Sequence, residues 1–336
     1  MAWVTFALSG IVIMIAGTKL SHYGDRIAEH SGLGRLWIGV VLLAAATSLP
    51  EMLTAVSAVL IDAPNLAVGD LFGAGLGNML TLALIDLAHR QKRVWQQAAL
   101  EQTLIASLAV IMTGLAGLFI LVRHSFPSFQ IGIGPLAIAL IYLFGMRVVF
   151  RQESMRRRAE QLQRVVQKEK AAFTRPVIDG SLKQAGWGFA AAAAGILVAA
   201  PLMAKSAVEI AVETGISSTF IGTSLVAIVT SLPEMVTTFA AVRLGAFDLA
   251  VGNLFGSNAF NMAILFIADM AYWNGPLLAA VDPTHAVTAF VSILLMTVGI
   301  MGIMYRAEKR FLFIEPDSAL MITGYLLGMA LIFSLG

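Results

Sequence analysis

The sequence contains no cysteine and has little charge of either sign. Its 336 residues include 22 Lys and Arg and 20 Asp and Glu, so 12% are charged, whereas a soluble domain has about 25%. These shortages exclude disulfides, thiolate metal sites, cysteine nucleophiles and an ordinary water-facing surface. The net charge of +2 gives no sign of a patch that binds nucleic acid.

Long apolar runs occupy most of the chain instead. Hydrophobic residues make up 58% and the mean hydropathy is +0.84, which indicates a polytopic membrane protein. The spans should be helices of about 20 residues, because an open strand in lipid would leave backbone groups unpaired. No cleavable signal peptide is expected, since no basic region precedes the first apolar segment. The ten apolar segments lie near 2–18, 36–61, 65–88, 99–122, 131–150, 186–204, 217–244, 247–270, 284–305 and 318–335.

The distribution of Lys and Arg orients these segments. With the N-terminus outside, 20 of the 22 basic residues fall in or beside inner loops, and only Arg123 and Lys205 fall outside. Both termini are therefore predicted to lie outside. The basic stretch 151–183 is predicted to be a helical cytoplasmic linker, either a simple solvated connector or a region that binds lipid headgroups.

The two halves of the sequence repeat each other. Residues 38–79 align without a gap to 221–262, at an offset of 183, with 23 of 42 positions identical. Because each half has five segments, the second copy enters the membrane from the opposite face, as in many secondary transporters. We expect a first repeat at 1–150, the linker, and a second repeat at 184–336. A duplication with only structural consequences is the alternative.

Each copy carries the motif Thr-Ser-Leu-Pro-Glu deep inside an apolar segment, at 47–51 and at 230–234. A carboxylate at that depth costs about 2.5–3.5 kcal/mol on insertion scales. Two carboxylates at equivalent positions, Glu51 and Glu234, therefore indicate a site on the pseudo-two-fold axis.

The proline of each motif opens the helix backbone. Pro50 and Pro233 have no N–H, so carbonyls of the preceding turn can point at a cation. Neighbouring carbonyls and hydroxyls then complete an all-oxygen cluster, contributed by Thr47, Thr230, Ser48 and Ser231. Hard cations such as Ca²⁺ take about 6–8 oxygens, and zinc or copper is disfavoured because no His or Cys is near. In the alternative interpretation each Glu hydrogen-bonds across helices and the prolines only kink them.

The second part of each copy, at 69–78 and 252–261, is rich in glycine and in amide side chains. Asn78, Asn261 and Ser257 lie on helical faces that can offer oxygens to the same cavity, since residues four apart share a face. The glycines are predicted to serve close helix packing, because a phosphate loop would need a GK[ST] sequence.

Three aspartates leave alternatives open. Asp70 is either a ligand that replaces a hydroxyl missing at Ala74, one turn away, or an acid at a favourable helix start. Asp86 and Asp269 recur at the ends of their spans, and we interpret them as interfacial, with an entry or gating role as the alternative.

The pattern TSLPE followed by GNxxGSNxxN, present twice in inverted halves, resembles the Ca²⁺:cation antiporter superfamily, and within it the prokaryotic sodium/calcium exchangers. The resemblance covers essentially the whole chain. It implies an all-α fold of ten transmembrane helices as two inverted five-helix repeats, in a prokaryotic cytoplasmic (inner) membrane. It also implies ion sites on helices 2, 3, 7 and 8, with helices 1 and 6 sliding during alternating access.

The resemblance further implies roles for individual residues. Glu51 and Glu234 would be the central Ca²⁺ carboxylates. The other implied ligands are the carbonyls of Thr47, Thr230, Ala44 and Ala227, the hydroxyls of Ser48, Ser231 and Ser257 at Na⁺ sites, and the amides of Asn78 and Asn261 at the centre. The chain departs from the family at Ala74, usually serine, and at Asp70, usually asparagine, which puts the Na⁺ coupling in question.

The predicted function is secondary antiport of Ca²⁺ against Na⁺ or H⁺, since one pair of carboxylates matches the charge of one Ca²⁺. A passive cation channel, or an antiporter of another divalent such as Mn²⁺ coupled to protons, is the alternative. An intramembrane enzyme is disfavoured because the chain has no HExxH and no nucleophile–His pairing. The expected partners are the lipid bilayer and small inorganic cations, with no cofactor, nucleic acid or obligate protein partner.

Overall fold

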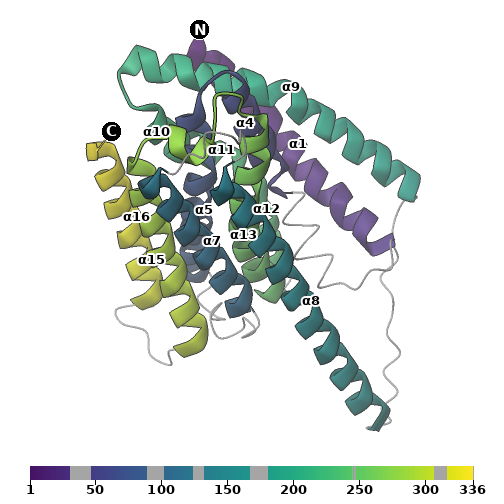
Figure 1. The fold of residues 1–336 in the computed structure, drawn as a ribbon. Coiled ribbons are helices and arrows are strands. Elements are labelled where there is room, and N and C mark those ends of the chain that lie inside the picture. The colour runs from purple at the N-terminus through teal and green to yellow at the C-terminus, as the bar shows by residue number, and fades with distance from the viewer. Residues whose placement is uncertain are drawn as a thin grey trace.

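The protein folds as a bundle of helices in a computed structural model, which describes residues 1–30, 47–88, 102–123, 132–166, 181–243, 245, 247–305 and 316–335 (Figure 1). Every regular element of the described residues is helical. The elements are α1 (Ala2–His30), α4 (Leu49–Leu60), α5 (Pro64–Ala88), α7 (Gln102–Val122), α8 (Ile133–Val166), α9 (Leu182–Thr214), α10 (Ser218–Ile221), the π-helix η2 (Gly222–Val226), α11 (Ala227–Thr230), α12 (Leu232–Arg243), α13 (Phe247–Ala271), α14 (Leu277–Ala280), α15 (Thr284–Tyr305) and α16 (Pro316–Leu335).

The helix boundaries repeat at the same interval as the sequence. α4 and α12 differ by 183 residues at both ends, and so do α5 and α13. The starts of α8 and α16 also differ by 183 residues. The repeat that is visible in 42 aligned residues therefore extends to helices whose sequences have diverged.

Most of the predicted spans are present as single helices. Eight helices of the described residues are long and apolar enough to cross a membrane, and Ser218–Thr230 with Leu232–Arg243 forms a ninth span that bends by 45°. The remaining predicted segment, 36–61, is described only from residue 47 onward, where it ends in α4.

Two helices are longer than the sequence predicted. α1 and α9 were expected to end near residues 18 and 204 but continue to His30 and Thr214. α8 continues as a helix into the predicted helical linker as far as Val166. The physical reason is that hydropathy marks only the lipid-buried part of a helix, whereas backbone hydrogen bonding continues through polar residues. Beyond the other helices, α8 projects from the bundle (Figure 1).

The two repeats interlock through reciprocal helix contacts. α7 and α8 of the first repeat pack on α13 of the second, and α15 and α16 of the second pack on α5 of the first. α1 packs on α12 and α9 packs on α4 in the same exchanged manner. α1 and α9 also lie side by side at the edge of the bundle (Figure 1). Each repeat therefore surrounds the central helices of the other.

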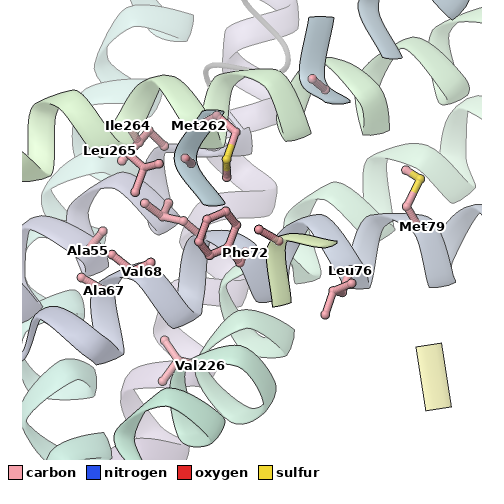
Figure 2. Close-up of a cluster of buried hydrophobic side chains, with 14 of the residues drawn as sticks. Ala55, Ala67, Val68, Phe72, Leu76, Met79, Val226, Met262, Ile264 and Leu265 are labelled. Atoms are coloured by element: carbon pink, nitrogen blue, oxygen red, sulfur yellow. The ribbon is translucent and has the colours of Figure 1, made fainter. Parts of the chain in front are cut away.

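Small residues allow α5 to approach the broken seventh span closely. Phe72 fills one face of α5 within a cluster that includes Val68 and Val226 (Figure 2). At Gly69 and Gly73, a Cβ would collide with the backbone of Thr219 and Thr223. These contacts confirm a packing role for two of the glycines, because only a residue without a side chain allows the two backbones to come this near.

We expect Gly73→Ala to destabilise the fold and Gly77→Ala to leave it intact. The added methyl at position 73 would press on the backbone of Thr223, whereas no atom lies within 4 Å of a Cβ at position 77. Overpacking of this kind costs about 1–3 kcal/mol. The thermal unfolding midpoint of purified protein measures the difference, and equal midpoints for the two variants would contradict the proposed packing.

Candidate functional site

The serine of each Thr-Ser-Leu-Pro-Glu motif departs from helical geometry directly before a helix. Ser48, before α4, has φ −87° and ψ 10°, and Ser231, between α11 and α12, has φ −83° and ψ 2°. These nearly identical values lie outside the helical range, and a proline without N–H follows two residues later in both cases. The same departure from helical geometry therefore lies at this position of both repeats, and the release of carbonyls toward a cation stays a prediction.

The two glutamates lie at the start of the helices that follow these breaks. Glu51 is 0% and Glu234 1% exposed. The Ser231 hydroxyl donates to Glu51 Oε1 at 3.0 Å, and the Ser48 hydroxyl donates to Glu234 Oε1 at 3.0 Å. Each repeat thus holds the carboxylate of the other, as a pseudo-two-fold axis requires. The second oxygen of each carboxylate accepts no hydrogen bond.

On either side of this pair the two threonine hydroxyls have different partners. Thr47 Oγ1 lies 3.4 Å from Ser257 Oγ, a contact between two hydroxyls. Thr230 Oγ1 donates to Asp70 Oδ1 at 2.9 Å. The structure therefore brings Asp70, from α5, into the same buried cluster as the motif residues.

Three amide side chains line the next part of the site. Asn78 Nδ2 donates to Asn258 Oδ1 at 2.8 Å, which leaves Asn78 Oδ1 without a hydrogen-bond donor. Both side-chain polar atoms of Asn261 are buried without a partner. Asn258 is a residue that the sequence analysis missed. Asn258 aligns with Gly75 in the repeat, and this mismatch is the sequence feature that could have identified it. In the structure Asn258 Nδ2 donates to the Gly75 carbonyl at 3.4 Å.

Of the two alanine carbonyls in the predicted ligand set, one lies outside the described residues. Ala44 belongs to the stretch that the structure does not describe. The Ala227 carbonyl accepts from Ser231 N at 3.1 Å and lies 3.2 Å from Thr230 Oγ1. That hydroxyl has a single proton, which Asp70 accepts at the shorter distance of 2.9 Å, so the Ala227 carbonyl keeps a lone pair for an ion.

The arrangement can hold a cation with oxygen ligands. Among the residues discussed above, those with a buried side-chain oxygen that accepts no hydrogen bond are Glu51, Glu234, Asp70, Asn78 and Asn261. A buried polar atom without a partner costs about 1–3 kcal/mol, and more when it is charged, so this set favours a bound cation. No three His, Cys, Asp or Glu side chains of the described residues are grouped closely enough to hold a metal ion. The donors near a cation would therefore include neutral oxygens beside the Glu pair.

The other two aspartates serve the fold rather than this cluster. Asp86 accepts from the Ser318 hydroxyl at 2.7 Å. Asp269 accepts from the backbone N–H groups of Gly132 and Leu277, both at 2.7 Å. Both side chains are buried. Each aspartate fixes an adjoining helix end inside the protein, and its position at the membrane interface stays a prediction.

Comparison with known proteins gives consistent results over most of the chain. Residues 1–152 and 185–335 match a family described as sodium/calcium exchanger protein. The inner membrane protein YrbG of Escherichia coli strain K12 is 28% identical over 255 residues, which cover 76% of this chain and 75% of YrbG. The putative antiporter CaxA of Alkalimonas amylolytica is 26% identical over 274 residues, which cover 79% of each chain.

A solved structure has the same fold. The sodium-calcium exchanger NCX_Mj superposes with a TM-score of 0.60 at 21% identity, over 98% of this chain and 99% of that chain. The likeness confirms the predicted fold class, an all-α membrane protein built from two inverted five-helix repeats.

We expect Asp269→Ala to lower stability more than Asp269→Asn. Alanine leaves two buried N–H groups without an acceptor, whereas asparagine keeps one oxygen. Each unpaired group costs about 1–3 kcal/mol. Thermal unfolding of the two purified variants tests this order. A gating role would instead predict altered transport at unchanged stability, and that result would contradict the structural role.

Proposed function

Because the chain belongs to the sodium/calcium exchanger protein family, we propose that it is a secondary antiporter that exchanges Ca²⁺ for Na⁺ or H⁺. One observation carries the proposal. Two carboxylates meet in the apolar interior, and each has one oxygen held by a serine of the opposite repeat and one oxygen with no hydrogen-bond donor. Such oxygens are suited to a cation that binds and leaves.

In the proposed site the central divalent ion is held by Glu51 and Glu234. The free amide oxygens of Asn78 and Asn261 and the carbonyls of Thr47 and Thr230 supply further ligands, within the 6–8 oxygens that Ca²⁺ takes. Ser48, Ser231 and Ser257 contribute hydroxyls to monovalent positions, and Asp70 adds a third acid. Ala44 and Ala227 stay predicted ligands through their backbone carbonyls.

Exchange follows from the charge of this site. Two ionised carboxylates in a low-dielectric interior repel each other strongly unless cations balance them. When Ca²⁺ leaves, the site must accept Na⁺ or H⁺ before it can face the other side, because an unbalanced pair of charges would oppose the transition. Transport of one ion is thereby tied to transport of the other, with Ca²⁺ extruded as Na⁺ or H⁺ runs down its gradient.

The packing of α1 supports alternating access around this site. A Cβ at Gly17 of α1 would collide with the Pro233 ring and lie 3.3 Å from Pro50 Cγ. The same glycine therefore contacts the broken turns of both repeats. In the proposed cycle α1 and α9 move as a pair along these turns and expose the site to one side at a time.

The proposed setting is a prokaryotic inner membrane with both termini outside. In the proposed division of the chain, a first repeat at 1–150 and a second at 184–336 flank a basic cytoplasmic linker at 151–183. The bias of Lys and Arg toward inner loops supports the orientation. No protein partner is required, because both repeats of the site belong to one chain.

We expect Glu51→Gln and Glu234→Gln each to reduce Ca²⁺ transport to background. Either change leaves one carboxylate for a doubly charged ion while keeping the shape and a hydrogen-bond acceptor. Radiolabelled Ca²⁺ flux into reconstituted vesicles, with Na⁺ and pH gradients varied separately, measures the loss and identifies the counter-ion. Glu213→Gln, at an exposed position on α9, is the charge-matched control and should transport normally.

Two outcomes would refute this function. Wild-type-like flux in both glutamine variants would remove the carboxylate pair from the site. Ca²⁺ retention that is the same with and without an opposing Na⁺ or proton gradient would exclude antiport. Flux through a channel would instead lack stimulation by counter-ion on the opposite side and would not saturate at low turnover.

A further inference from the structure

The two flanks of the central carboxylate pair carry different charge. The Glu–Ser bonds across the axis are matched at 3.0 Å on both sides. The threonines beside them are also equivalent in the repeat, yet Thr47 contacts Glu234 of the central pair and the hydroxyl of Ser257, whereas Thr230 contacts a further carboxylate, that of Asp70. The symmetry of the site is therefore broken one residue away from its centre.

The cause of this difference lies in two positions of the repeat. Ser257 of α13 corresponds to Ala74 of α5, so the hydroxyl that faces Thr47 has no equivalent facing Thr230. Asp70 corresponds to Asn253. The Asn253 side chain forms its hydrogen bond within its own repeat, where Nδ2 donates to Thr238 Oγ1 at 3.1 Å. In the first repeat the position of Thr238 is Ala55, which offers no such partner.

Asp70 therefore points across the repeats and keeps one oxygen without a donor. Its side chain is 0% exposed, Oδ1 accepts from Thr230, and Oδ2 accepts no hydrogen bond. A carboxylate in such a place is stable only when a cation or a proton neutralises it. The Thr230 hydroxyl cannot do this, because a hydroxyl carries no charge.

The number of carboxylates at each position determines the charge of the cation that it can balance. Glu51 and Glu234 together match one divalent cation, and Asp70 alone matches one monovalent cation. A divalent ion at Asp70 would carry an excess positive charge beside the centre, where like charges repel strongly in a low dielectric.

We propose that Asp70 and Thr230 form a charged monovalent-cation subsite for Na⁺, whereas the flank at Thr47 and Ser257 stays uncharged. The proposal rests on the proposed function, of which it specifies the counter-ion and one of its positions. The subsite binds Na⁺ more tightly than the hydroxyl pair does.

Asp70→Asn separates this subsite from a purely structural contact. Asparagine keeps an oxygen that accepts from Thr230 and removes only the charge. We expect the Na⁺ concentration for half-maximal binding to rise by about tenfold or more, because a unit charge next to an ion far outweighs a dipole. The Ca²⁺ concentration for half-maximal transport should change much less. Equilibrium binding of radiolabelled Na⁺ to purified protein, without Ca²⁺, gives a readout that does not depend on transport.

A second variant, Ala74→Ser, keeps the test decisive if Asp70→Asn folds poorly. Ala74→Ser retains the charge and adds the hydroxyl that Ser257 provides on the other flank, so Na⁺ binding should strengthen. Asp70→Asn with Ala74→Ser should restore part of the lost affinity, because it converts this flank into a neutral hydroxyl site. Glu213→Gln removes one exposed acid and should bind Na⁺ as the wild type does.

The outcomes distinguish this proposal from the proposed function. Unchanged Na⁺ binding in Asp70→Asn, or a wild type that exchanges Ca²⁺ for protons and binds no Na⁺, would overturn the subsite and leave Ca²⁺ antiport standing. Loss of Ca²⁺ affinity as large as the loss of Na⁺ affinity would also overturn it, because Asp70 would then belong to the divalent position. A wild type without gradient-dependent Ca²⁺ flux would refute the proposed function itself.

Discussion

The burial of two like charges in an apolar interior is the constraint on which the rest of this structure depends. Glu51 and Glu234 are removed from water, and each is held through a single oxygen by a serine of the opposite repeat. One hydroxyl does not replace the hydration of a carboxylate. The balance must come from a cation, which is why a fold with so few charged residues places two of them here.

The surrounding helices place backbone and side-chain oxygens around the space beside this pair. Breaks at Ser48 and Ser231 end the regular hydrogen bonding beside the carboxylates. Glycines of α5 allow the backbone of the broken span to approach, and α1 crosses both broken turns at Gly17. A change in the position of α1 would therefore alter contacts in both halves of the site, because Gly17 of α1 lies against Pro50 and Pro233.

Because each glutamate is held by a serine of the opposite repeat, neither repeat forms the site alone. The same crossing lets single substitutions in one copy differentiate the two flanks while the centre stays symmetric. Ala74 and Asp70 do this on one side, and Asn258 does it beside the amides, where it fixes Asn78 but has only glycine as its counterpart. A duplicated site with matched centres and unmatched flanks can hold one divalent ion and still treat monovalent ions unequally.

The sequence by itself determined the membrane class, the all-α fold, the repeat and the pair of buried glutamates, because hydropathy, period and charge act locally along the chain. The sequence predicted most spans correctly, but it predicted the ends of α1 and α9 too early, because hydropathy does not detect a helix that continues into polar residues. The tertiary structure alone decided the partners of each side chain: the exchange of serines between repeats, the contact of Thr230 with Asp70 and the backbone N–H groups that Asp269 accepts from. These contacts join residues that lie more than a hundred positions apart in the sequence, so they are determined only when the helices pack together.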